Sequence, residues 1–198
     1  LVFDYIVELI EEKKEYKTVE FSKTTITELM IPSYANFSGK IHGGILLSLM
    51  DKVAFACAAK HSGCYCVTVS VEGVQFIQPV EVGELVSLDA TVNYVGKSSM
   101  IIGIHIESMN PKTGITKHTN TCYFTMVAKG DDGKVNQVPG LVLETNEEIK
   151  RFAEGKAIKK MSRKKRELLN KGIEEYSDKN ILNNCEGERC EISFTPNK

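Results

Sequence analysis

The densest run of apolar residues lies in the middle of the chain. Within residues 43–61 (GGILLSLMDKVAFACAAKH), nearly every position from Ile45 to Ala59 is apolar or small, and Gly63 follows. A helix that is apolar all round, but shorter than the ~18 residues that span a bilayer, is a core helix covered by other structure. Residues 43–61 are therefore predicted to form a buried helix that stops at Gly63.

Other segments alternate apolar and polar residues with a period of two, which is typical of half-buried strands. In the strand that starts at Cys66 the apolar phase switches at Gly73, which predicts a β-bulge there. The alternation over 85–95 is expected to place Tyr94 on the same face as Val92. The predicted strands are 20–31 (stopped by Pro32), the segment from Cys66, 85–95, 99–107 and 119–128.

The strands after the helix are joined by short turns. Short turns force antiparallel neighbours, because parallel strands need long crossovers. The arrangement that buries both partners is an α+β fold in which a curved antiparallel sheet wraps around the central helix. The other face and the edges of this sheet stay open, so we expect a second copy of the chain to pair with it.

The two ends of the chain differ from this body. Apolar positions on one helical face predict a leading amphipathic helix within residues 1–19, before a body at 20–140. A charged helical extension is predicted over 141–176, followed by a flexible tail over 177–198. Within the extension, residues 156–171 hold eight Lys or Arg against one Glu, as a solvated helix on an oligomer surface would.

Composition excludes several classes of protein. The 198 residues are 42% hydrophobic and 26% charged, as in ordinary globular domains. Residues 1–149 carry a net charge of −6 and residues 150–198 carry +5, and an acidic body with a basic tail is unlike a nucleic-acid-binding domain. We expect no membrane span and no secretory signal, because no apolar run is long enough and the first residues are acidic and amphipathic.

The six cysteines are irregularly spaced, and four lie in apolar stretches. This pattern predicts free thiols in a reducing cytosol, and therefore a cytoplasmic location. Cys185 and Cys190 are too widely spaced for the common zinc knuckle, so no metal site is predicted.

Asp51 lies among apolar residues in the predicted core helix. A buried carboxylate is costly without a partner, so such a residue is paired, lies at an opening, or is functional. A partly desolvated carboxylate is a better base or nucleophile near neutral pH. The alternative is a structural ion pair with Lys52 or with a group on a neighbouring strand.

A histidine and two glycines open the same helix. Gly43 and Gly44 follow His42, and glycine lets a ligand approach the free N–H groups of a helix start, which suit a developing oxyanion. Tight packing of the helix against the sheet is the alternative reason for these glycines. Asn36, in the preceding loop, is able to orient a water or polarise a carbonyl, although loop asparagines also simply make turns.

Taken together, these motifs resemble one enzyme family. The segments NFSGKIHGG (36–44) and LMD (49–51) are similar to the hotdog-fold acyl-CoA thioesterases of the bacterial and cytosolic (brain-type) acyl-CoA hydrolase family. Further matching segments follow in order: VSVEGVQFIQP (69–79), VGE (82–84), VGKSS (95–99) and CYFTMVA (122–128). The similarity covers residues 20–140.

The resemblance implies a hotdog fold and hydrolysis of fatty acyl-CoA to free acid and CoA, without a cofactor. It also implies a catalytic Asn36 and a catalytic Asp51 supplied by opposite subunits of a dimer, and assembly as a trimer of dimers. Gly43 or Gly44 would offer its N–H to the thioester oxygen, while Asp51 would activate a water or attack the carbonyl directly. We expect His42 to position the substrate, with direct proton transfer as the alternative.

Further expectations concern substrate binding. Lys97, Ser98 and Ser99 offer a cation and two hydroxyls to the phosphates of CoA, unless they form an ordinary hairpin turn. Phe76 is expected to line the acyl tunnel between subunits. Contact of the basic stretch 156–171 with a nucleotide, with CoA or with an anionic surface is an alternative to a solvated helix. The alternative function is a non-catalytic acyl-CoA-binding regulator, which would bind acyl-CoA without releasing its thiol.

Overall fold

The computed structural model describes residues 16–175 and 187–193. A first compact unit ends at Lys159, and a second unit, which contains the rest of the last helix, begins at Lys160. In chain order the elements are β1 (Tyr16–Thr18), α2 (Val19–Ser22), β2 (Thr24–Leu29), the 3-10 helix η1 (Pro32–Tyr34), α3 (Gly43–Ser62), β3 (Tyr65–Glu72), β4 (Leu85–Val95), β5 (Ser99–Met109), β6 (Thr116–Lys129), β7 (Gly140–Val142) and α4 (Asn146–Glu175).

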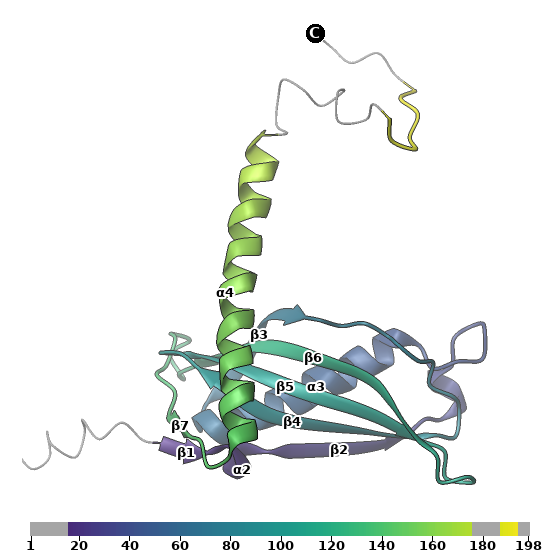
Figure 1. Cartoon of the computed structure of the whole chain (residues 1–198), viewed down its shortest axis with the longest axis horizontal. Coiled ribbons are helices and arrows are strands. Elements are labelled where there is room, and N and C mark those ends of the chain that lie inside the picture. Colours follow the sequence, from purple (N-terminus) through teal and green to yellow (C-terminus); the bar gives the residue numbers. More distant parts are fainter. Residues whose placement is uncertain (1–15, 176–186, 194–198) are drawn as a thin grey trace, which may run out of the picture. The chain divides into compact units, whose positions relative to one another are not determined.

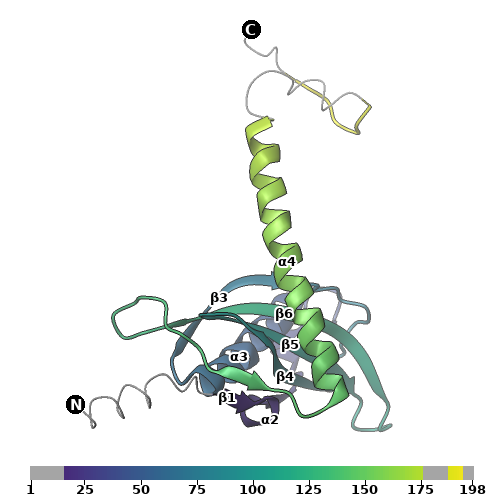
Figure 2. The same ribbon diagram turned by 60° about the vertical axis from the view of Figure 1, so that its left-hand side comes forward.

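Five of the strands form one curved sheet around α3 (Figures 1 and 2). The sheet is antiparallel throughout, in the order β2-β4-β5-β6-β3, and this confirms the predicted α+β hotdog fold. One expected pairing is wrong, because β3 pairs with β6 and not with its successor β4. The connection over 73–84 is long enough to cross the sheet, and it leaves β3 as an edge strand.

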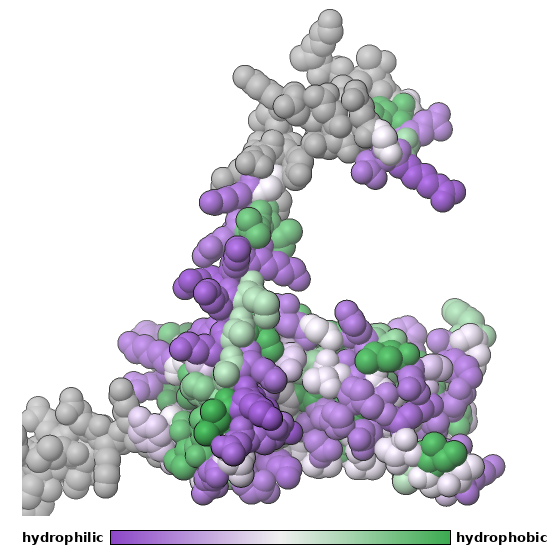
Figure 3. All heavy atoms as spheres, in the orientation of Figure 1, coloured by the Kyte–Doolittle hydropathy of each residue, from purple (hydrophilic) through white to green (hydrophobic). Residues whose placement is uncertain are grey.

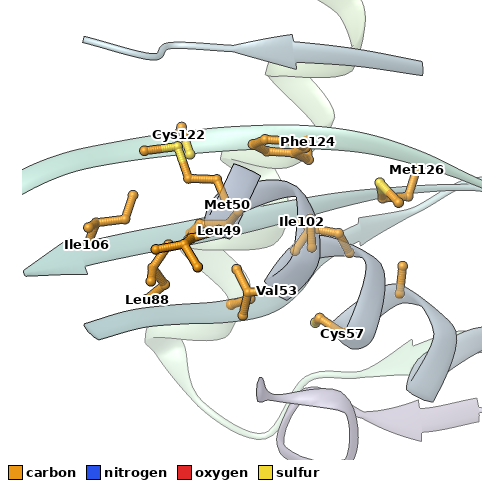
Figure 4. Packing of buried hydrophobic residues seen from close by; sticks show 14 of the residues in the cluster. Leu49, Met50, Val53, Cys57, Leu88, Ile102, Ile106, Cys122, Phe124 and Met126 are labelled. Atoms are coloured by element: carbon orange, nitrogen blue, oxygen red, sulfur yellow. The ribbon is translucent and has the colours of Figure 1, made fainter. Parts of the chain in front are cut away.

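Helix α3 begins and ends at clear capping residues. The Nδ1 atom of His42 accepts a hydrogen bond from Gly44 N, and Gly63 ends the helix with a left-handed φ of 69°. Figure 4 shows the core packed between this helix and the sheet. Its labelled members are Leu49, Met50, Val53 and Cys57 of α3, and Leu88, Ile102, Ile106, Cys122, Phe124 and Met126 of the strands.

The prediction that α3 is covered on all sides is wrong for a single chain. Leu47, Asp51 and Phe55, spaced four residues apart, are exposed along one face of the helix. Two of these three residues are apolar, so hydrophobicity alone does not distinguish this face from the buried one. The exposed face is a surface that another molecule can cover.

Two predictions about the strands, the bulge at Gly73 and the shared face of Val92 and Tyr94, are wrong. Gly73 makes no bulge: β3 ends one residue earlier, and its register shifts at Val69 instead. In β4 the register shifts between Val92 and Tyr94, so these two side chains do not share a face. Tyr94 packs against Phe152 of α4, with ring centroids 5.1 Å apart, while Val92 lies in the core.

The segments around the body follow the prediction in part. The predicted strand over 20–31 is divided, because Thr18 caps the short helix α2 through its side chain and β2 starts only at Thr24. A short parallel pair, β1 with β7, was not predicted. The leading helix expected within 1–19 and the tail over 177–198 lie largely outside the described residues.

Helix α4 confirms that a helical extension follows the body, and it begins at Asn146, after the short strand β7. Hydrophilic side chains dominate its surface (Figure 3). In the described residues, no helix is long and apolar enough to cross a membrane.

A buried ion pair holds the end of the connection that crosses the sheet. The carboxylate of Glu84 accepts hydrogen bonds from Ser108 Oγ, from the N–H of Glu81 (3.0 Å) and from Lys117 Nζ (2.9 Å). Burial alone raises the pKa of Glu84, but these hydrogen bonds and the charge of Lys117 outweigh it and hold the pKa below 4.5. The 73–84 connection is thereby fixed to β5 and β6.

Candidate active site

Asp51 has a specific polar partner on the neighbouring edge strand. The hydroxyl of Thr68, on β3, donates a hydrogen bond of 2.6 Å to Oδ1 of Asp51. The same hydroxyl lies 3.3 Å from the sulfur of Met126, which is a much weaker acceptor, so the proton goes to the carboxylate. A hydrogen bond to one carboxylate oxygen fixes the rotamer of Asp51 and leaves the second oxygen available.

The register of β3 explains why Thr68 reaches Asp51, because Thr68 pairs with the core residue Met126 and lies two residues after the buried Cys66, on the face toward α3; a β-bulge follows it. The register of β3 against β6 shifts between Thr68 and Ser70, so Val69 is the extra residue. A bulge re-aims the side chains next to it, and bulges are frequent beside active sites. Thr68 was not among the residues that the sequence predicted for the site. Its only signal in the sequence is a hydroxyl residue within an apolar strand.

The surroundings of Asp51 are apolar but not closed. Asp51 is exposed in the single chain, which agrees with the expected alternative that it lies at an opening, and Leu47 and Phe55 flank it one turn away on either side. The rings of Phe55 and Tyr65 lie 5.7 Å apart, which links the helix to the start of β3. No ion pair joins Asp51 to Lys52 or another cation in the described residues. A covering molecule would desolvate the carboxylate.

The two backbone N–H groups expected to bind the thioester oxygen, those of Gly43 and Gly44, differ in whether they are free to donate. The N–H of Gly44 is occupied, because it donates to Nδ1 of His42 at 2.8 Å. The N–H of Gly43 has no acceptor in the part of the chain that the structure describes. A Cβ atom at Gly43 would lie 3.2 Å from the ring of Phe76, so the structure brings Phe76 to the helix start. Gly43 is therefore the better oxyanion donor of the two.

Asn36 is held firmly within the loop before α3. Its Oδ1 atom accepts from Ser38 N (2.9 Å), Ser38 Oγ (2.7 Å) and Lys40 N (3.2 Å). Its amide nitrogen makes no hydrogen bond to any described residue. The side chain is exposed, so a pre-oriented N–H donor faces solvent beside the helix start.

A single chain does not bring all of these groups together. Asp51 follows Gly43 by eight residues of helix, which places it about 12 Å further along the axis. Groups that act on one carbonyl must lie within about 3 Å of the reacting atoms. The helix start and Asp51 of the same chain are therefore too far apart to act on one carbonyl.

Lys97, Ser98 and Ser99, which are predicted to bind the phosphates of CoA, lie at a tight turn between β4 and β5. The N–H of Gly96 donates to the carbonyl of Ser99 at 2.7 Å, while the carbonyls of Lys97 and Ser98 accept from Val138 and Ala128. The side chain of Lys97 is exposed, and the hydroxyl of Ser99 accepts a hydrogen bond from Lys159 at 3.0 Å. The backbone of the turn is that of an ordinary hairpin connection. Its side chains and that of Lys159 supply ammonium and hydroxyl groups.

Within the described residues, no three histidine, cysteine or acidic side chains cluster in a way that would hold a metal ion. Five described cysteines are free thiols. Burial raises the pKa of both Cys57 and Cys122 to about 12, so these two thiols stay protonated and unreactive near neutral pH.

Comparison with known proteins identifies the family. The profile of the thioesterase superfamily matches residues 38–115. Protein VdlD of Helicobacter pylori is 41% identical over 158 residues, which cover 80% of this chain and 89% of VdlD. The crystal structure of an apo-hexameric acyl-CoA thioesterase is 34% identical, with a TM-score of 0.72, over 77% of this chain and 97% of that one.

A second set of structures bears on the site. The acyl-CoA hydrolase of Staphylococcus aureus, solved with butyryl-CoA and CoA, is 29% identical with a TM-score of 0.72, over 81% of this chain and 98% of that one. Alanine variants of an asparagine, an aspartate and a threonine of that enzyme were also solved. Successive members of this trio are 15 and 17 residues apart, and the same intervals separate Asn36, Asp51 and Thr68 here.

The fold, the matched superfamily profile and an identity above 30% over nearly the full length of a solved relative agree. This chain belongs to the acyl-CoA hydrolase family of the thioesterase superfamily, and it is a thioester hydrolase with the hotdog fold.

Proposed function

We propose that the protein hydrolyses fatty acyl-CoA to the free acid and CoA, at a site that two copies of the chain complete. The observation that carries the proposal is the pair of Asp51 and Thr68, exposed on an apolar face about 12 Å from the helix start. One copy contributes Asp51 and Thr68. The other copy contributes Asn36 and Gly43.

The chemistry assigned to these groups is the addition of water to a thioester. Asp51 takes a proton from a water whose oxygen attacks the carbonyl carbon. The N–H of Gly43 and the amide of Asn36, both on the second copy, stabilise the charge that develops on the carbonyl oxygen. The carbon–sulfur bond then breaks, and the CoA thiolate leaves and takes up a proton. Direct attack by Asp51, through an anhydride that water then opens, is the alternative route.

The exposed apolar residues support a specific mode of pairing. Val69 and Val71 of the edge strand β3 are 50% and 41% exposed, and Leu47 and Phe55 of α3 are each 38% exposed beside them. A strand edge with unpaired backbone groups next to an apolar helix face is a ready surface for a second copy. We propose a dimer through β3 and α3, and a hexamer formed from three dimers. Hexameric relatives support this assembly.

The remaining predicted residues are assigned to binding. Phe76, which is 49% exposed next to Gly43, would contact the acyl chain or the pantetheine arm. His42 is assigned a positioning role, since its Nδ1 already caps the helix at Gly44. Lys97, Ser98 and Ser99 are assigned to the phosphates of CoA. No cofactor is required by this chemistry.

Complementation between two inactive variants tests the shared site. We expect Asp51→Asn and Asn36→Ala each to lower kcat/KM for acyl-CoA by about 10²-fold or more. When the two variants are co-expressed, each mixed dimer holds one site with both native residues. Random pairing should then restore about a quarter of the native activity, measured as thiol release.

The matched control mixes Asp51→Asn with Thr68→Val. Because Asp51 and Thr68 contact each other within one chain, no mixed dimer contains an intact pair, and activity should not rise above that of Thr68→Val alone. Full activity of Asp51→Asn, or no restoration in the first mixture, would disprove the shared site. Saturable acyl-CoA binding without thiol release by the native protein would instead favour a binding regulator.

A further inference from the structure

The first part of α4 delivers a lysine to the turn between β4 and β5. The ammonium of Lys159 donates a hydrogen bond of 3.0 Å to the hydroxyl of Ser99, and it lies 5.2 Å from the centroid of the Tyr94 ring. Lys159 is partly buried, unlike the exposed Lys156 and Lys160 on the same helix. The position of its ammonium is therefore set by contacts with the body.

Two glycines make this approach sterically feasible. A Cβ atom at Gly96 would collide with Nζ of Lys159, and one at Gly155 would lie 2.8 Å from Cβ of Tyr94. Gly155 thus lets α4 pack closely against β4, and Gly96 leaves the space that the ammonium occupies. The tilted packing of Phe152 against Tyr94, with an interplanar angle of 48°, completes the contact.

Within residues 16–175 and 187–193, Lys159 has no counter-ion. Among the described residues, no carboxylate forms an ion pair with Lys159, and none does so with Lys97 on the same turn. A partly desolvated cation is unfavourable without a negative partner. Two cations together with the hydroxyls of Ser98 and Ser99 form a set of donors that suits a phosphate.

The sheet register relates this turn to the proposed catalytic pair. Ser99 pairs with Val127 of β6, and Val127 pairs with Val67 of β3, which is the residue before Thr68. Two strand spacings, about 10 Å, therefore separate Ser99 from the backbone next to Thr68. The phosphates of CoA lie at the far end of the pantetheine arm from the thioester, so a phosphate site is needed at some distance from Asp51.

We propose that Lys159 binds a phosphate group of CoA and so makes α4 a part of the substrate site. This assignment rests on the proposed function, and it adds a residue from outside the matched segments of the body. It gives the first turns of the extension a role in discriminating CoA esters from thioesters that lack the nucleotide.

The test compares esters with and without phosphates. We expect Lys159→Met to raise KM for acyl-CoA by about 10-fold, with kcat within twofold of native, because a charge-assisted hydrogen bond to the substrate is lost. KM for the same acyl group on pantetheine should not change. Lys112→Met, an exposed lysine in the turn after β5, removes the same charge and should leave both KM values unchanged.

A second variant displaces Lys159 without removing it. Gly96→Ala puts a methyl group where Nζ lies and should reproduce the rise in KM for acyl-CoA. The affinity of the native protein for dephospho-CoA, compared with its affinity for CoA, then locates the contact. If removal of the 3′-phosphate weakens binding as much as Lys159→Met does, Lys159 binds the 3′-phosphate. If it does not weaken binding, Lys159 binds the diphosphate. Either result supports the proposal.

Equal changes in KM for both esters, or no change for either, would overturn the role of Lys159. Calorimetric binding of CoA alone to the native protein and to Lys159→Met gives the same answer without any turnover. If the native protein cleaves no acyl-CoA, the proposed hydrolysis is refuted. The role of Lys159 is still decided by calorimetry, because Lys159→Met should lower the affinity for CoA about 10-fold, and an unchanged affinity would overturn the role.

Discussion

At the scale of single residues, the hydrogen bond between Thr68 and Asp51 is the most specific feature of the molecule. It joins an exposed helix position to an edge strand 17 residues later in the chain, and the pairing of Thr68 with the core residue Met126 directs the hydroxyl toward α3. Such a contact restricts the carboxylate to one rotamer before any substrate arrives. Pre-orientation of this kind lowers the entropic cost of the reaction.

Removal of this hydrogen bond should slow turnover. Thr68→Val keeps the shape of the side chain but loses the donor, so Asp51 is free to rotate, and we expect kcat to fall about 10-fold. Thr68→Ser keeps the hydroxyl and should retain most of the activity. Steady-state kinetics with a good acyl-CoA substrate checks both values. An unchanged kcat in the valine variant would show that Thr68 does not position Asp51.

The sequence predicts these residues to different degrees. Asp51 is conspicuous because a charge interrupts an apolar helix, and Asn36 gains meaning from its distance to Asp51. Thr68 is not predictable, because threonine is common in strands and its partner is distant in sequence. The exposed face of α3 is also missed, since periodicity does not tell a face covered by the chain's own sheet from one left for another copy.

At the scale of elements, the connection over 73–84 decides the topology. It carries Phe76 past the start of α3 and is fixed at its end by Glu84, which is buried against Ser108 and Lys117. Because β3 and β4 follow each other in the sequence, a hairpin between them is the expected pairing. The twelve residues of the connection are enough to cross the sheet instead, and the buried ion pair holds that crossing in place. The strand segments themselves are predictable from their period of two.

The ion pair of Glu84 should make stability depend on pH. Its pKa is lower in the folded than in the unfolded chain, so ionised Glu84 stabilises the fold above its ordinary value of 4.5, and this contribution is lost as pH falls through the folded value. Glu84→Gln should cost about 1–3 kcal/mol at pH 7. It should cost progressively less on acidification below pH 4.5. Urea unfolding at a series of pH values measures both, and a pH-independent difference would contradict the assignment.

At the scale of the whole molecule, one apolar surface is left uncovered in the single chain. Its members lie on the edge strand β3 and on the free face of α3, and both Asp51 and Thr68 lie among them. A continuous apolar area around a carboxylate is unfavourable in water. Covering it with a second copy would bury the apolar groups and desolvate the carboxylate together.

A charge on this surface should therefore separate the copies. Val71→Lys places an ammonium on the exposed edge of β3, and we expect loss of the oligomer and of acyl-CoA hydrolysis together. Light scattering after gel filtration measures the mass. Ile115→Lys changes an equally apolar, 66% exposed residue in the turn before β6 and should leave mass and activity unchanged. A folded, oligomeric and active Val71→Lys protein would exclude this pairing.

The position of Asp51 eight residues after Gly43 on one helix has a consequence for how the enzyme responds to its own abundance. In the proposed shared site, a single chain supplies Asp51 to one site and Gly43 to another, and it contains no complete site. By mass action, dilution then lowers not only the number of chains but also the fraction of them that are competent. Expression level would thus set the specific rate of hydrolysis as well as the total.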